Sequence, residues 1–202
     1  MPPRCDSLKK KTDMIKDLVK QTRSYRSFDE SRRISHEELV ELVDTARLTA
    51  STRNMQPLKY RLVHTPEECA AVLPLTGWAA GLKGIKMPPE GHAPVAYIVI
   101  CCDTTMVQDH VPFLRDTGIA AQTIMLSATE MGLGGCMIGS FSASRIAQTL
   151  SIPEGVRPLL VLGLGKPDEK VVLVESEDGK TAYWRDESAH YTPKRKLEDV
   201  IL

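Results

Sequence analysis

Two long segments of the chain carry hydrophobic residues at helical spacing. In residues 39–50, leucine, valine and alanine fall on one stripe, which is typical of an amphipathic helix. Ser35 and Glu38 stand three residues apart just before this stripe, and this spacing predicts a capping box at the start of the helix. Residues 113–131 leave little polar surface on any side, so they predict a helix that lies in the core and ends at Gly132.

Shorter amphipathic segments predict three more helices. We expect a flexible N-terminus over residues 1–12, with a helix opening at Thr12, where apolar residues begin to recur at helical spacing. The other two helices are expected over residues 66–73 and 142–150.

Apolar runs rich in valine and isoleucine predict buried strands. These runs span residues 60–64, 94–102, 133–139 and 158–164. Residues 171–174 and 181–184 flank Asp178 and Gly179, a pair that favours a two-residue hairpin turn. The Gly- and Pro-rich residues 76–93 are expected to form a mobile loop or lid. Helices and strands are interspersed, so the pattern predicts an α+β or α/β fold in one domain over residues 13–202.

Composition excludes several classes of protein. The 202 residues include 26 Lys and Arg against 26 Asp and Glu, and this zero net charge argues against a nucleic-acid partner. The longest apolar run, Ala93 to Cys102, is too short to span a membrane, which takes about 20 residues. The N-terminus has no apolar signal core, and the five cysteines follow no regular spacing. We therefore expect a cytoplasmic protein without a membrane partner.

Few residues form a recognisable catalytic or metal-binding pattern. The five histidines include no His-x-x-x-His pair and the cysteines no Cys-x-x-Cys pair, so no metal site is predicted. The glycines that follow the helix of residues 113–131 lack the dinucleotide fingerprint, because position 137 is methionine. Cys136 with His110 or His190 could form a nucleophilic pair, but a free cysteine in an apolar strand is more often a small hydrophobic residue.

Two basic clusters lie near opposite ends of the chain. Arg23 and Arg26 flank Ser24, and two guanidinium groups with a hydroxyl suit a phosphate group. Lys194, Arg195 and Lys196 form the second cluster. Each cluster taken alone is better explained as a solvated basic surface.

A polar loop follows the first amphipathic helix. Ser51, Asn54 and Gln56 offer a hydroxyl and two amides, which together can match the donor and acceptor edge of a heterocycle. The alternative is an ordinary loop after a helix.

Together these features resemble the nitroreductase family of FMN-dependent oxidoreductases, over about residues 13–202. Five segments carry the resemblance, and they occur in the family's order. They are Arg23-Ser24-Tyr25-Arg26-Ser27-Phe28; Ser51-x-x-Asn54-x-Gln56-Pro57; Asp116-x-Gly118-x-Ala120-x-Gln122 followed by Gly132-Leu133-Gly134; Met137-Ile138-Gly139-Ser140; and Asp186-x-x-x-His190-x-x-Pro193-Lys194-Arg195.

The resemblance implies an α+β sandwich, in which helices flank a central, mainly antiparallel sheet and a C-terminal extension reaches the partner protomer. It implies a homodimer with two FMN sites at the interface. The residues that it assigns to FMN are Arg23, Ser24, Lys194 and Arg195 at the phosphate and ribityl chain, Arg26 near the pyrimidine edge, Ser51, Asn54 and Gln56 from the other protomer, and the strand end Met137, Ile138, Gly139 and Ser140, with backbone near Gly139 and Ser140 close to the flavin N5.

The resemblance also implies ping-pong hydride transfer from NADH or NADPH, through the flavin N5, to a nitroaromatic, a quinone or a similar acceptor. No catalytic side chain is obligatory, because the cofactor carries the redox chemistry. Two alternatives stay open: a family member with other flavin chemistry, such as reductive dehalogenation or flavin fragmentation, and a non-catalytic flavin-binding protein.

The sequence departs from the family pattern at three places. Position 22 is threonine, where many members carry a further arginine, and residues 76–93 and 166–185 match nothing in the pattern. We expect residues 76–93 to select the substrate, in an open apolar stacking site lined by Trp78, Met87 or Phe141.

Overall fold

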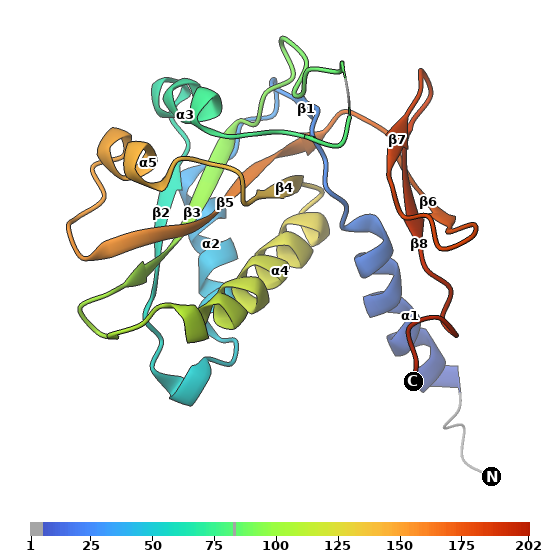
Figure 1. The fold of residues 1–202 in the computed structure, drawn as a ribbon, viewed down its shortest axis with the longest axis horizontal. Coiled ribbons are helices and arrows are strands. Elements are labelled where there is room, and N and C mark those ends of the chain that lie inside the picture. Colours follow the sequence, from blue (N-terminus) through green and yellow to red (C-terminus); the bar gives the residue numbers. More distant parts are fainter. Residues whose placement is uncertain (1–5, 83) are drawn as a thin grey trace.

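The computed structural model describes residues 6–82 and 84–202, with side chains from residue 14 onward. A five-stranded sheet forms its centre, and strand β5 (Val156–Pro167) lies in the middle of that sheet (Figure 1). On one side β5 pairs with β3 (Ala96–Asp103), which pairs with β2 (Leu58–Val63). It also pairs with β4 (Gly134–Ile138) and with β1 (Phe28–Asp29). All these pairs are antiparallel, which confirms the α+β fold with a mainly antiparallel sheet.

Helices cover both faces of this sheet. On one face α2 (His36–Arg47) and α4 (Leu114–Glu130) pack against alternate residues of β3 and β5 and form the larger core. On the other face α3 (Pro66–Val72) and α5 (Ala143–Thr149) pack against the intervening residues of the same strands. Met137 is partly exposed, whereas its neighbour Ile138 is buried in the core beneath α3 and α5.

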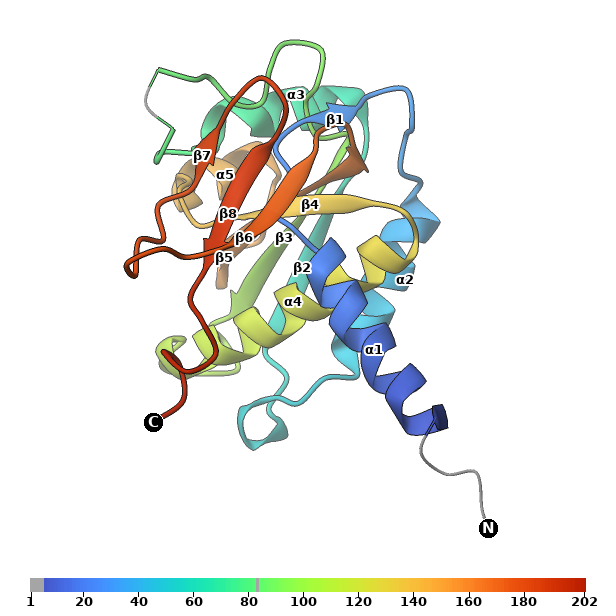
Figure 2. The same cartoon turned by 90° about the vertical axis from the view of Figure 1, so that its right-hand side faces the viewer.

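A smaller sheet lies beside α1 (Asp6–Gln21), apart from the main body (Figures 1 and 2). Its central strand β8 (His190–Lys194) runs parallel to β6 (Val171–Glu175) and antiparallel to β7 (Trp184–Arg185).

The hairpin expected between residues 171–174 and 181–184 is therefore wrong. Asp178 and Gly179 do form a tight turn with positive φ angles of 50° and 69°, as a two-residue hairpin requires. The chain does not fold back onto β6 after this turn. Instead β8 pairs with β6 along its whole length, and β7 pairs with the other edge of β8. The amide of Ser176 also donates to the carbonyl of Lys194, 2.7 Å away, and extends the pairing of β6 with β8.

Most other elements lie where the hydrophobic pattern places them. The Ser35 and Glu38 capping box is formed in full at the start of α2. Helix α1 begins at Asp6 instead of Thr12, because the lysine-rich turn before Thr12 has good helix propensity without an apolar pattern. Residues 1–5 of the expected flexible N-terminus lie outside the described residues.

Short 3₁₀ helices and a long loop complete the chain. The 3₁₀ helices are η1 (Thr52–Asn54), η2 (Leu73–Leu75) and η3 (Val111–Phe113). Within the described part of residues 76–93 there is no helix or strand, and the loop is held at its start, where the amide of Gly77 donates to the carbonyl of Ser140. None of the helices described here is long and apolar enough to cross a membrane.

Gly135 fixes the closest approach between β4 and β5. A Cβ atom at this position would lie 2.3 Å from the carbonyl oxygen of Gly163. The carbonyl of Gly135 also accepts a hydrogen bond of 2.9 Å from the amide of Tyr25. The N-terminal segment is thus attached to the sheet at a point where only glycine fits.

We expect Gly135→Ala to lower the free energy of unfolding by about 3 kcal/mol or more, because a backbone atom cannot move aside as a side chain can. Gly179→Ala is the matched control: that residue has a positive φ but open space around it, so its cost is only about 1 kcal/mol. Urea unfolding measures both values. Equal costs for the two variants would contradict the steric explanation.

Candidate functional site

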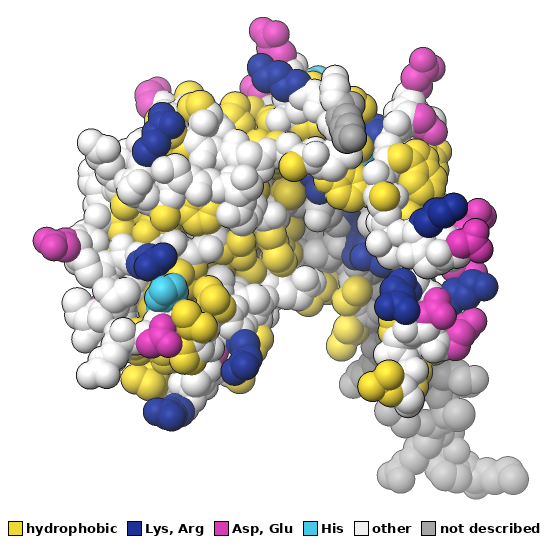
Figure 3. All heavy atoms as spheres, in the orientation of Figure 1, with side chains coloured by type: hydrophobic (Ala, Val, Ile, Leu, Met, Phe, Trp, Pro, Cys, Tyr) yellow, Lys and Arg dark blue, Asp and Glu magenta, His cyan; other side chains and the backbone are white. Residues whose placement is uncertain are grey.

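A cavity of about 340 Å³ opens between α4, β4 and the smaller sheet. Figure 3 shows this hollow between the main body and the part of the chain that contains the smaller sheet, with basic side chains in the hollow. The lining residues are Thr22, Arg23, Ser24, Arg26, Gln122, Met125, Met137, Tyr183, His190, Thr192 and Lys194. Three of them are cationic and none is a carboxylate, so the cavity is suited to an anion.

Arg23 follows the last turn of α1 and caps it. Its Nε donates to the carbonyl of Thr22 at 2.6 Å, and its Nη2 donates to the carbonyl of Val19 at 2.8 Å. A cation at this point also offsets the negative end of the helix dipole. Burial lowers the pKa of Arg23 from its ordinary value, but an arginine remains charged. The N–H groups not used for capping are free to bind a ligand.

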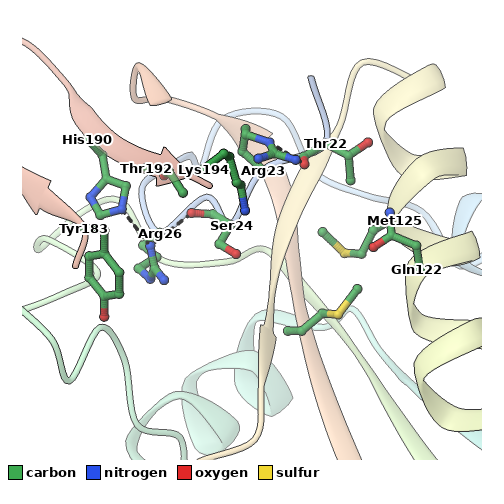
Figure 4. A pocket seen from close by; sticks show the side chains of 11 residues that line it. Thr22, Arg23, Ser24, Arg26, Gln122, Met125, Tyr183, His190, Thr192 and Lys194 are labelled. Atoms are coloured by element: carbon green, nitrogen blue, oxygen red, sulfur yellow. Dashed lines mark hydrogen bonds between the residues drawn. The ribbon is translucent and has the colours of Figure 1, made fainter. Parts of the chain in front are cut away.

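Arg26 holds an unpaired donor in the same cavity. Its Nη1 donates to the carbonyl of Ser24 at 3.2 Å, and its Cζ lies 5.3 Å from the centre of the Tyr183 ring. Figure 4 shows the guanidinium between Tyr183, His190 and Ser24. Its Nε is buried and has no hydrogen-bond partner among the described residues. A buried donor without a partner is costly, so an acceptor on a bound molecule fits this position.

Glu169 holds the segment that carries Arg26. Its carboxylate accepts hydrogen bonds from the backbone amides of Arg26 and Ser27 and pairs with the guanidinium of Arg185. The side chain is only 4% exposed. Glu169 thus ties the N-terminal segment to the chain after β5 and to β7. No sequence motif marks Glu169, because it lies in residues 166–185, which match nothing in the family pattern.

Five of the twelve predicted site residues line this cavity: Arg23, Ser24, Arg26, Met137 and Lys194. Two segments 168 residues apart in sequence, measured from Arg26 to Lys194, therefore meet in space. Arg195 is exposed and does not line the cavity.

Most of the predicted site residues at the end of β4 and just after it do not line the cavity. The side chain of Ile138 lies in the core, and no described atom comes within 4 Å of a Cβ built at Gly139. Ser140 packs against Gly77 of the long loop. Of this strand end, Met137 lines the basic cavity and Ile138, Gly139 and Ser140 do not.

The polar loop with Ser51, Asn54 and Gln56 lies elsewhere on the same chain, next to the N-terminal turn of α4 (Figure 1). The side chains of Asn54 and Gln56 are exposed and hydrogen-bond to each other at 3.1 Å. Arg53, Asn54 and Gln56 all have positive φ angles between 51° and 53°, a conformation that costs energy in residues other than glycine.

Asp116 holds this strained loop in place. Its carboxylate accepts from the Ser51 hydroxyl at 2.7 Å, from the Thr52 hydroxyl at 2.7 Å and from the Thr52 amide at 2.9 Å. Burial alone would raise the pKa of Asp116, but these hydrogen bonds outweigh burial and lower it below its ordinary 3.8. The motif that begins at Asp116 marked this residue, but the sequence did not reveal its contact with the loop.

The long loop borders a second cavity of about 560 Å³. Trp78 and Met87 line this cavity and not the basic one. The Trp78 ring packs against Gly163 of β5, and Phe141 packs against the core beneath α3 and α5. We expected Trp78, Met87 or Phe141 to line a site in which both substrates stack on the flavin. Within the described chain, none of these residues lines the basic cavity.

The structure does not assemble the Cys136 and His110 pair around the cavity, since only His190 of the two histidines lines it. Cys136 is 6% exposed. Burial raises the pKa of the Cys136 thiol, which favours a protonated, structural cysteine.

The fold and the cavity define an α+β protein with a basic cavity at the edge of its central sheet. A statistical model described as the Nitroreductase family matches residues 19–87 and 90–166. Since this match covers well over half of the chain, the protein belongs to the nitroreductase family.

Relatives of known name have moderate similarity to this chain. A protein of Methanothermobacter thermautotrophicus, provisionally named NADH dehydrogenase/NAD(P)H nitroreductase, is 29% identical over 163 residues, which cover 79% of this chain and 80% of the relative. The oxygen-insensitive NADPH nitroreductase of Helicobacter acinonychis is 25% identical over 168 residues, 67% of this chain and 79% of the relative.

Solved structures support the fold. The nitroreductase family protein of Streptococcus pneumoniae matches with a TM-score of 0.66 and 18% identity, over 93% of this chain and 98% of that one. An FMN-dependent nitroreductase of Clostridium difficile matches with a TM-score of 0.60 and 22% identity, over 76% of this chain and 87% of that one.

We expect Asp116→Asn to lower the free energy of unfolding by about 2–3 kcal/mol at neutral pH, because an amide donor would then face the donors of the loop. Since the pKa of Asp116 is lower in the folded than in the unfolded chain, its contribution is present above pH 3.8 and is lost as the pH falls through the folded pKa. Urea unfolding at neutral and acid pH measures this.

The control for this prediction is Asp44→Asn, since Asp44 forms an exposed pair with Arg47 and contributes at most about 0.5 kcal/mol. A stability difference between wild type and Asp116→Asn that persists undiminished at acid pH would contradict the role of the ionised carboxylate.

Proposed function

We propose that this protein is an FMN-dependent oxidoreductase that transfers a hydride from NADH or NADPH to a small organic acceptor. One observation carries the proposal: within the described part of the chain, three cations converge on a cavity that no carboxylate lines, and one of them, Arg26, keeps a buried Nε without a partner. This donor set suits a ligand that combines a phosphate with the polar edge of a ring. Family membership and the names of the relatives support FMN as that ligand.

Residues of both basic clusters would hold the cofactor. Arg23, Ser24 and Lys194 would bind the phosphate and ribityl chain, with Arg195 adjacent to them at the surface. Thr22 adds no cation, and its hydroxyl is engaged by the carbonyl of Leu18 and by Thr129. Lys196 is not a free substitute for the arginine that many members carry at position 22, because its Nζ lies 3.7 Å from the carboxylate of Glu175.

The protein's own contribution to the reaction is electrostatic and steric. Bound FMN supplies the hydride-transfer chemistry between NADH or NADPH and an acceptor such as a nitroaromatic or a quinone. Arg26 places a fixed positive charge in the cavity, where it stabilises negative charge that develops during reduction. Met125 and Met137 give the cavity an apolar wall that excludes water. The two substrates would occupy the same space in turn, which corresponds to ping-pong kinetics.

A homodimer is part of this proposal. Apolar side chains are exposed on α1, on α4 and along the C-terminal tail. They include Met14, Ile15, Leu114, Ile119, Leu197, Val200 and Ile201. Large exposed apolar surface is typical of an interface, and a second copy of the chain would bury it. The C-terminal tail would then reach the partner, and the loop with Ser51, Asn54 and Gln56 would complete the partner's FMN site.

The state of the cysteines supports a cytoplasmic location. Cys69, Cys101, Cys102 and Cys136 are buried free thiols. Free thiols persist most readily in a reducing compartment.

We expect the purified protein to be yellow, to release FMN on denaturation and to lose its visible absorbance when NADH or NADPH is added without oxygen. Arg26→Ala should raise the FMN dissociation constant about tenfold or more, because a charge-assisted contact is lost. Arg157→Ala is the control, since Arg157 is exposed on β5 and does not line the cavity.

The outcomes of this experiment separate the functions. A protein that takes up no FMN would overturn the proposal. A flavin that binds but is not reduced would identify a non-catalytic binding protein, and reduction without transfer to nitroaromatics or quinones would point to dehalogenation or another flavin reaction.

The shared site can be tested by mixing defects. Arg26→Ala and a double variant of Asn54 and Gln56 to alanine should each retain little FMN as homodimers. In a co-expressed heterodimer, one site receives both defects and the other receives none, so about half of the FMN occupancy should return. Dual affinity tags isolate the heterodimer, and absorbance measures its FMN content. No recovery would show that the loop does not serve the partner's site.

A further inference from the structure

His190 makes an unusual contact inside the basic cavity. It is 3% exposed, and its Nε2 lies 3.4 Å from the Nη1 of Arg26 (Figure 4). A guanidinium has only donors, so Nε2 must be the acceptor in this contact. An imidazole that accepts at Nε2 is neutral and carries its proton on Nδ1. The contact therefore exists only in one protonation state of His190.

The surrounding structure fixes the imidazole in this position. The amide of His190 donates to the carbonyl of Lys170 at 2.8 Å as β8 pairs with β6. Its ring centre lies 5.2 Å from that of Tyr183, the same ring that packs under Arg26. The Tyr183 hydroxyl in turn accepts a hydrogen bond of 3.0 Å from the amide of Gly81. Arg26 and His190 therefore share one rigid support.

The charges around His190 favour the neutral ring. Arg26 faces it from the N-terminal segment, Arg185 from β7 and Glu169 from the chain after β5. Tyr183 faces it from the segment before β7, and Lys194 lies on the same strand. Burial first, and then the two arginines, lower the pKa of His190 from its ordinary 6.5, although Glu169 opposes this.

We propose that His190 is a positioning residue that holds Arg26 toward the cofactor as a neutral hydrogen-bond acceptor, and that protonation of His190 releases Arg26 and weakens FMN retention. This inference rests on the proposed FMN function. Once His190 is protonated, which requires a pH below its lowered pKa, a proton on Nε2 would face the N–H group of Arg26, and two cations would repel each other. FMN retention therefore has an acid limit that belongs to this side chain.

The test compares FMN retention by three loaded proteins: wild type, His190→Gln and the control His36→Gln. Glutamine offers an amide oxygen as acceptor but does not titrate, and His36 is an exposed residue on α2. Each protein is equilibrated between about pH 8 and about pH 5.5, and the fluorescence of free FMN in an ultrafiltrate gives the dissociation constant. Protonation of the FMN phosphate, which has a pKa of about 6, affects all three proteins equally.

We expect His190→Gln to retain FMN within about threefold of wild type at the upper pH. Toward acid pH, wild type and His36→Gln should lose about tenfold more affinity than His190→Gln. Parallel pH profiles for wild type and His190→Gln would overturn the inference, as would tighter binding by wild type at acid pH. If wild type retains no FMN at any pH, the proposed function fails instead.

A second measurement does not depend on a variant. Ring-nitrogen NMR of the wild-type protein reports the protonation state of each histidine. His190 should be neutral and carry its proton on Nδ1 at about pH 8, where FMN retention is expected to be strongest. If His190 is charged at neutral pH, or carries its proton on Nε2, the inference is wrong.

Discussion

The hydrogen-bonded pairing along both edges of β5 is the constraint on which the rest of the structure depends. β5 pairs with β3 along most of its length, with β4 over residues 161–165, and with β1 at Lys166 and Pro167. The pairings with β4 and β1 bring the segment before β1, with its arginines, beside β4, and the close approach at Gly135 fixes the distance. The chain then leaves β5 directly into Glu169, whose carboxylate binds the same segment from the other side. The sheet thus positions a site whose residues are mostly outside it.

The parts of the fold that the sequence predicts are those in which local and tertiary preferences agree. The Ser35 cap and the apolar runs of β3, β4 and β5 each form locally and bury the same residues. The prediction of a hairpin around Gly179 is wrong because the turn is set locally, whereas the strand pairing is not. The strand that pairs with β6 is β8, which has only five residues and one buried proline. Two-residue β1 is likewise defined only by its place beside β5.

The candidate site divides in the same way. Arg23, Ser24, Arg26 and Lys194 could be assigned from sequence, because a family motif surrounds each of them and the resemblance places both motifs at one phosphate. Glu169 and Tyr183 could not, because they act through contacts with segments distant in sequence and lie in no motif. His190 lies within a family motif, but the motif does not show that its Nε2 accepts from Arg26, which depends on a single distance between the two side chains. Pairwise geometry of this kind is invisible in a linear pattern.

The wall of the basic cavity that β8 provides has a consequence for biosynthesis. The segments that carry Arg23 and Met137 are made before this wall, and the central sheet is complete once β5 has been synthesised. Residues 183–194 come last among the lining residues. A nascent chain that stops after β5 would contain a finished hydrophobic core but an open, one-sided groove. In the proposed site, cofactor binding would therefore be a late event, which follows folding of the main body and requires the smaller sheet to be in place.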